Sequence, residues 1–370
     1  MKPKQKSRDD YNRGDETMIN LFQSLDDKKA GRQDDDAAST SLCNEVLKQL
    51  GVAACLLAAI IAGTIPSTSR YVQDRGYTPY QIIFFNDLLI SLVALGVIIY
   101  YRTDIRVSSY KRQAQLIFQG VFRFVGQLFL MLAYLYVPPA NAENVTNASI
   151  PVFSVIVAGI FLHEIPSLVV IFGSICNIAG VILLGYGSLY EELSHTEPHT
   201  ERAFVGFGLA VASAVISACL NTSIRSLLQN VIVPKSLLLA CAHGICSGLA
   251  GVLACIFSST WQLDAISSGV LIVNVTTHGI FIALLYAGLE FVEVNAQSAL
   301  RQVPALSAYV LQWVLLGFKP TIYEVIGLAC IVAGTSAVVV VGLVERWKQK
   351  KRVTFADEMS FHYYEKDIAE

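Results

Sequence analysis

Two arginines lie deep inside apolar stretches of the sequence, and their permanent charge is the strongest chemical signal in the chain. A guanidinium group does not lose its proton in a protein, so each arginine needs an anion nearby. For Arg123 two alternatives are open. Its anion is either a protein carboxylate, from Asp87 or Glu143, in a structural salt bridge, or an acidic group of a bound solute.

Arg301 has weaker candidates for a protein partner, because Glu290 and Glu293 lie near the ends of the apolar stretches. A guanidinium fork matches the geometry of a carboxylate or phosphate. For Arg301 we therefore expect the anionic group of a solute.

Polar residues accompany both arginines at helical spacing. Gln119, Arg123 and Gln127 recur at i, i+4 and i+8, which places them on one face of a helix. Asn274 and His278 have the same spacing in the second half of the chain, and Asn295 precedes Arg301. The residues expected to bind a solute are Arg123, Arg301, Asn144, Asn147, Asn295, His278 and Gln119.

The stretch from 140 to 162 is unusually polar along its first half, and it contains Pro151. A helix surrounded by lipid would not tolerate Glu143, Asn144 and Asn147 together. These side chains are expected either to line a cavity or to make hydrogen bonds between helices.

Histidines and buried acids are candidates for carrying a proton, because the unperturbed pKa of histidine lies near neutrality. Asp87, Glu143 and His243 are the expected coupling groups, although a histidine in a helix is also often held by structural hydrogen bonds. Asp87 is the only acid expected at a depth comparable to that of the arginines, so the site is expected to carry a positive excess.

The composition of the chain indicates which classes of protein it can belong to. Of the 370 residues 54% are hydrophobic and only 15% are charged, and many of the charges lie in the two tails. A net charge of −2 excludes a basic nucleic-acid binder, and the low charge content excludes an ordinary soluble enzyme. The chain carries no phosphate-binding loop or metal-binding motif, so we expect no cofactor, no metal and no enzymatic activity.

Apolar runs long enough to cross a bilayer predict an all-α polytopic membrane protein with ten transmembrane helices. Basic residues gather on the side of the tails, which places both tails in the cytosol. The expected divisions are a cytosolic tail (1–46), a first repeat (47–188), an acidic non-cytosolic loop (189–202), a second repeat (203–344) and a cytosolic tail (345–370). The expected spans are 47–69, 80–101, 115–137, 140–162, 166–188, 203–224, 235–258, 267–289, 293–316 and 321–344.

An internal repeat follows from sliding the chain on itself by about 154 residues. Asn141-Ala142 then falls on Asn295-Ala296, and Gly173 falls on Gly327. Five spans in each half would turn the second half upside down relative to the first. Inverted repeats of this kind are typical of secondary transporters, whose substrate binds near the midplane between the halves.

The five-plus-five pattern, Pro151-Val-Phe153 and Leu162-His163-Glu164 resemble the EamA type of the drug/metabolite transporter superfamily. The run from Ala142 to Phe153 is most similar to the G branch of solute carrier family 35. The resemblance covers about residues 47–344. It implies a central cavity between the halves, with the fifth span of each half to one side.

The sequence thus predicts a secondary transporter or exchanger of a small organic solute, an anionic metabolite such as a carboxylate, working by alternating access. The alternative is a membrane adaptor that transports nothing and acts through its tails. The expected partners are the solute and the lipid bilayer, with no nucleic acid, and the cellular membrane is left open between plasma membrane and ER or Golgi. Some helix faces consist of small residues, which suit close packing inside the bundle or a homodimer interface. These residues include Gly173, Gly180, Gly327 and Gly334.

Overall fold

The computed structural model of the chain describes residues 53, 56–103, 105, 109–162, 168–194, 200–230, 234–257, 261–262, 264–288 and 303–337. Across these residues the chain is helical, with turns and short connections and no strand. The helices are α2 (Thr64–Gln73), α3 (Pro79–Tyr101), α4 (Tyr110–Tyr136), α5 (Pro139–Leu162), α6 (Leu168–Ser194), α7 (Thr200–Asn230), α8 (Lys235–Phe257), α9 (Ala265–Gly288) and α11 (Val303–Leu316). A further helix covers Ile322–Ala337.

Five of the described helices are long and apolar enough to cross a membrane: Pro79–Tyr101, Tyr110–Tyr136, Glu201–Ile224, Ser236–Phe257 and Ala265–Leu284. Large apolar side chains stand on their outward faces, as Ile99 and Ile272 do. Contiguous apolar surface of this kind suits lipid better than water.

Local signals in the sequence explain where several helices begin. Thr78 and Gln81 form a capping box at the start of α3, and Pro79 is in its first turn. Thr321 and Glu324 do the same for the helix Ile322–Ala337, with the Glu324 carboxylate accepting from the Thr321 N–H at 2.8 Å. α5 continues through Pro151 as one helix.

The acidic loop expected over 189–202 is shorter in the structure. α6 continues to Ser194 and α7 begins at Thr200, so Glu191 lies in a helix and Glu201 lies in the first turn of α7. Water can satisfy helix ends outside the bilayer, and an acid at a helix N-terminus is stabilised by the helix dipole. Helices therefore extend past the apolar run from which the loop was predicted.

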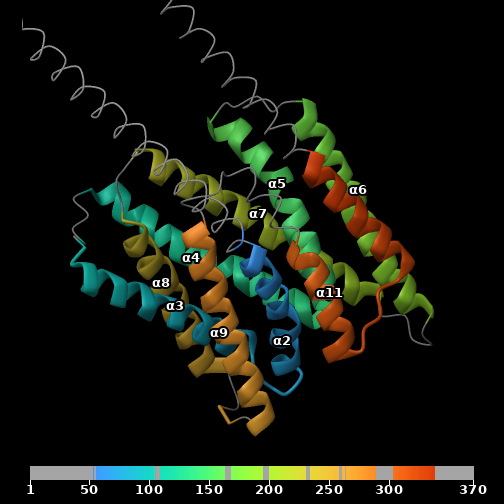
Figure 1. Cartoon of the computed structure of the whole chain (residues 1–370), viewed down its shortest axis with the longest axis horizontal. Coiled ribbons are helices and arrows are strands. Elements are labelled where there is room, and N and C mark those ends of the chain that lie inside the picture. Colours follow the sequence, from blue (N-terminus) through green and yellow to red (C-terminus); the bar gives the residue numbers. More distant parts are fainter. Residues whose placement is uncertain are drawn as a thin grey trace, which may run out of the picture.

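Helices of the first half pack against helices of the second (Figure 1). The most extensive contacts join α3 to α8 and α4 to α7, while α2 packs on α9 and α5 on both α7 and α11. Each half therefore contributes to one common bundle.

A contact between small residues joins α6 to the helix Ile322–Ala337, which is coloured red at one edge of the bundle in Figure 1. A Cβ atom added to Gly180 would lie 2.6 Å from the Gly327 carbonyl oxygen, and one on Gly334 would lie 2.9 Å from the Gly173 carbonyl oxygen. The expected small faces are thus occupied by packing within one chain. A homodimer stays a prediction, and it would need other surfaces.

Candidate functional site

A cavity of about 320 Å³ lies at the centre of the bundle. Residues from both halves form its walls, and α4 and α5 of the first half face α7, α8 and α9 of the second. The volume lies at the lower end of the range of small-molecule sites. Its polar lining consists of Asn86, Gln119, Arg123, Gln127, Tyr134, Glu143, Thr146, Asn147, Ser213, Ser217, Asn221, His243 and His278.

Asp87 is the centre of an ion-paired cluster at one wall. Its side chain is fully buried, and Oδ1 accepts from Arg123 Nε at 2.9 Å. His243 Nδ1 lies 2.5 Å from the same oxygen. Of the two acids expected as partners of Arg123, the structure selects Asp87, because α3 and α4 bring the two side chains together inside the first half.

Gln127 completes this cluster. With its amide oriented to satisfy both neighbours, its nitrogen donates to Asp87 Oδ2 at 2.7 Å and its oxygen accepts from Arg123 Nη2 at 3.1 Å. The Arg123 side chain is 24% exposed, and Arg123 is part of the cavity wall. The cluster, which we call the Asp87 centre, consists of Asp87, Arg123, Gln127 and His243.

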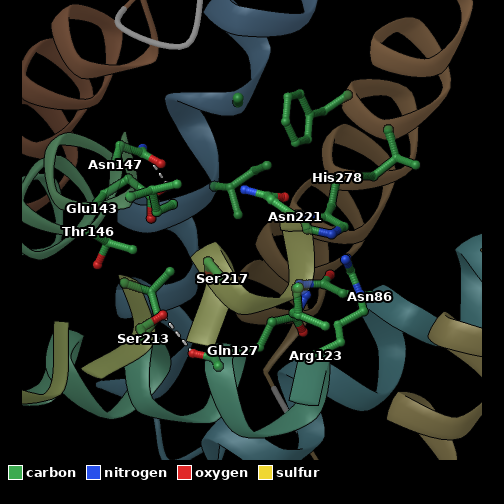
Figure 2. A pocket seen from close by; sticks show the side chains of 18 of the residues that line it. Asn86, Arg123, Gln127, Glu143, Thr146, Asn147, Ser213, Ser217, Asn221 and His278 are labelled. Atoms are coloured by element: carbon green, nitrogen blue, oxygen red, sulfur yellow. Dashed lines mark hydrogen bonds between the residues drawn. The ribbon is translucent and has the colours of Figure 1, made fainter. Parts of the chain in front are cut away.

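A second acidic group lies on another wall. Glu143 Oε2 accepts from the Tyr134 hydroxyl at 2.6 Å, and Oε1 accepts from Asn147 Nδ2 at 3.1 Å. Figure 2 shows Glu143 and Asn147 across the cavity from Arg123 and His278. We call Glu143, Tyr134 and Asn147 the Glu143 group.

Several polar atoms on the walls have unused hydrogen-bonding capacity. Neither ring nitrogen of His278 has a hydrogen-bond partner among the described residues, nor does Nε2 of Gln119 or Oδ1 of Asn86. Buried polar atoms are normally satisfied, and groups of this kind on a cavity wall suit a polar ligand.

The expected site residues separate into three sets. Six line the cavity: Gln119, Arg123, Glu143, Asn147, His243 and His278. Two lie close to it without forming its wall, since Asp87 acts through Arg123 and His243, and Asn144 is buried in α5. Asn295 and Arg301 lie outside the described residues.

Asn274, which the expected repeat aligns with Gln119, does not line the cavity. Its register matches that of Gln119, but its amide donates to Thr68 Oγ1 at 2.7 Å, to Ser69 Oγ at 3.0 Å and to the Ile65 carbonyl at 3.1 Å. The side chain therefore joins α9 to α2 by hydrogen bonds.

The expectation that no other acid is buried as fully as Asp87 is wrong. Glu324 is 1% exposed, and Asn141 Nδ2 donates to its carboxylate. Asn141 also accepts from the Tyr309 hydroxyl, and the Ala140 N–H donates to Gln312 Oε1 at 2.8 Å. Glu324 lies at a helix start because it forms capping hydrogen bonds with Thr321. The neighbouring helices α5 and α11 bury its side chain.

The expected site residues did not include a polar stripe on α7. Ser213, Ser217 and Asn221 recur at i, i+4 and i+8 and line the cavity beside α4, where the Ser213 hydroxyl donates to the Gly126 carbonyl. This spacing equals that of Gln119, Arg123 and Gln127, so the signal was present. Serine is common in membrane helices for packing reasons, which makes the same spacing less specific.

Among the residues that the structure describes, no three His, Cys, Asp or Glu side chains come together as a metal ion would require. The described side chains of this site offer charge, hydrogen bonding and proton exchange.

Part of the sequence matches a known family, and the fold is similar to a solved structure. Residues 49–186 match the model of the EamA-like transporter family, which supports the resemblance to the EamA superfamily. A crystal structure titled "Crystal structure of protein" is similar with a TM-score of 0.55 and 19% sequence identity, over 80% of this chain and 99% of that chain. At this identity the likeness concerns the fold alone.

The apolar helices and the family match together identify a multi-pass, all-helical membrane protein. The matched family is one of transporters, which is consistent with the expectation that the chain is not an enzyme.

Proposed function

We propose that this chain is a secondary transporter or exchanger of a small organic solute, with the central cavity as its binding site. One observation carries the proposal: helices from both halves enclose a cavity whose wall has polar atoms without partners among the described residues. A site between two halves is where a carrier with inverted repeats binds its substrate.

The architecture that we propose for this function has ten spans in two inverted five-helix repeats, with both tails in the cytosol. The glycine contact supports it. An offset of 154 residues relates Gly173 to Gly327 and Gly180 to Gly334, and the contacting pairs are Gly180 with Gly327 and Gly173 with Gly334. Exchange of the two helices converts one contact into the other, which is the property of a two-fold interface.

Alternating access is the mechanism that we propose for this architecture, and the distribution of hydrogen bonds supports it. In the proposed topology, Gln73 donates to the Met131 carbonyl at 3.1 Å and Tyr77 to the Trp261 carbonyl at 3.0 Å near the outer ends of the helices. The Asn141–Glu324 contact lies at the same ends. These bonds would have to break for the cavity to open outward.

We propose that the solute is an organic anion, in particular a carboxylate. Within its superfamily, we propose that the chain is most similar to the G branch of solute carrier family 35. Arg123, Gln119 and His278 offer donors at the cavity wall. Asp87 neutralises much of the Arg123 charge, so the anion proposal depends chiefly on Arg301.

Arg301 therefore provides the test. In liposomes containing the purified full chain, Arg301→Ala should weaken uptake of a labelled carboxylate by about tenfold or more, because loss of one desolvated charge contact costs about 2–5 kcal/mol. Arg301→Lys should restore part of the uptake, since lysine keeps the charge but loses the fork. Unchanged uptake in Arg301→Ala, or a preference for cations, would contradict the anionic substrate.

The wider proposal has a separate test. A thermal-shift screen of the purified protein against metabolites should find a ligand that raises its stability. If no solute is carried in liposomes while deletion of residues 1–40 abolishes the cellular role, the adaptor function is correct.

Accessibility labelling within 195–199 tests the topology, and labelling only from the cytosol would contradict it.

A further inference from the structure

Glu143 lies on the cavity wall, and among the described residues it has only neutral partners. Its two carboxylate oxygens accept from a phenol hydroxyl and from a carboxamide, at 2.6 Å and 3.1 Å. Within the part of the chain that the structure describes, no Lys, Arg or His side chain forms an ion pair with it.

Asp87, which contacts the cavity-lining residues Arg123 and His243 without lining the cavity itself, shows the opposite arrangement. Arg123 and His243 both contact its Oδ1 atom, and Gln127 contacts Oδ2. An ionised aspartate is stabilised there by a permanent cation. Among the described residues, the carboxylate behind the cavity wall therefore has a counter-ion, and the carboxylate on the wall has none.

An ionised carboxylate at the depth of a membrane span costs several kcal/mol unless a cation compensates it. Two neutral donors compensate only part of that cost. A carboxylic acid avoids it by holding a proton. The cavity beside Glu143 gives a path along which that proton can arrive and leave.

The other titratable and charged groups around Glu143 come from each neighbouring element, and they do not provide a counter-ion. On α2, Arg70 pairs with Asp74 at 2.9 Å and donates to the Tyr134 carbonyl. α7 contributes the uncharged Ser213 and Ser217. The remaining described groups are Tyr134 on α4, Tyr309 on α11 and Glu324 beyond Asn141. Arg123 and His278 lie across the cavity, and His243 contacts Asp87.

We propose that Glu143 is a proton-binding site of the transport cycle, separate from the Asp87 centre, and that its proton travels with the anionic solute. The proposal rests on the function proposed above. One proton from water adds to one carboxylate oxygen, which changes the charge of the side chain from −1 to 0. The same proton returns to water on the other side of the membrane when the solute leaves.

Charge explains the coupling. An ionised Glu143 would repel an anion inside a cavity of about 320 Å³. The protonated side chain removes the repulsion and becomes a donor to the anion. By linkage, the anion then favours protonation as strongly as protonation favours the anion.

The first experiment tests protonation without any transport. Dicyclohexylcarbodiimide forms a covalent adduct with carboxylic acids that hold a proton in apolar surroundings. Applied to the full-length purified protein, it should modify the peptide that contains Glu143, while the ion-paired Asp87 in the same molecules stays unmodified. Glu143→Gln should abolish that adduct. An unmodified Glu143 below neutral pH, in protein that keeps its thermal stability, would overturn the proposal.

The second experiment tests coupling in liposomes, with labelled succinate and labelled lactate as probes. In Glu143→Gln, net uptake driven by a pH gradient should fall by about tenfold or more. Exchange of label between equal internal and external pools should fall less than net uptake does, because exchange needs no net proton movement. Unchanged pH-driven uptake in the variant would overturn the coupling.

A control separates this inference from the function on which it rests. In Thr222→Ala, which removes a hydroxyl that bonds within α7 and leaves the cavity wall and the Glu143 carboxyl group unchanged, pH-driven uptake should persist. If the wild-type chain carries neither probe, the proposed substrate class fails, and the carbodiimide result still decides whether Glu143 holds a proton.

Discussion

The contact between α6 and the helix Ile322–Ala337 differs in kind from the contacts around the cavity. At the first, glycines bring two backbones together, with a Gly180 Cβ only 2.6 Å from a carbonyl oxygen if one were added. Around the cavity, ion pairs and hydrogen bonds join α3, α4, α7 and α8. Polar bonds can exchange with water or a solute during a cycle, whereas a backbone contact tolerates no displacement without loss of packing. This difference indicates that the contact between α6 and Ile322–Ala337 stays fixed, whereas the contacts around the cavity rearrange.

The largest expected effect is that of Asp87→Asn. The change leaves Arg123 without its carboxylate partner, and loss of one partner of a buried pair costs about 3–5 kcal/mol. Because the Arg123 side chain is 24% exposed, we expect the lower end of this range. Thermal unfolding of the purified variant provides the measurement.

A double variant makes this prediction sharper. Asp87→Asn combined with Arg123→Gln should be more stable than Asp87→Asn alone, because no cation is then left without its partner. If the double variant is the less stable, the Asp87 centre is not held by charge.

Gly180→Ala should have the next largest effect. The added methyl would lie 2.5 Å from Ile331 Cγ1, so the helices must separate, at a cost of about 1–3 kcal/mol. Gly185→Ala on the same helix is the matched control, because its nearest neighbour would be Phe207 at 3.9 Å. The control should gain up to about 1 kcal/mol from helix propensity. Equal melting temperatures for the two variants would show that this contact is not closely packed.

Ser213→Ala should have the smallest effect. Its hydroxyl donates to the Gly126 carbonyl at 2.8 Å and joins α7 to α4, and such bonds in membrane proteins are worth about 0.6 kcal/mol. Thr222→Ala is the control, because Thr222 donates to Ala218 within the same helix. A loss in Ser213→Ala greater than that in Gly180→Ala would reverse the comparison between the two regions.

Much of the helix pattern was predictable because each helix carries its own signals. The span expected over 80–101 is Pro79–Tyr101 in the structure, and that expected over 235–258 is Lys235–Phe257. Thr78 and Pro79 mark the start of the first, and Pro234 precedes the second. The choice of partner helices was not predictable in the same way, since an apolar face does not specify which other apolar face covers it.

The site was predictable in part for a related reason. Spacing alone placed Gln119, Arg123 and Gln127 on one face, and all three line the cavity. Spacing does not predict that Asn274 forms hydrogen bonds with α2 or that Glu324 is buried, because both outcomes depend on side chains of distant segments. Burial of an acid near a helix end follows from tertiary packing and leaves little trace in a local pattern.

The Asp87 centre also sets an order for assembly of the protein in the bilayer. Arg123 follows Asp87 by 36 residues, whereas His243 follows it by 156. At about 5–20 residues per second, the ribosome delivers His243 roughly 8–30 s after Asp87. We therefore expect Arg123 to pair with Asp87 before His243 is available, so that the acid enters the membrane together with its counter-ion.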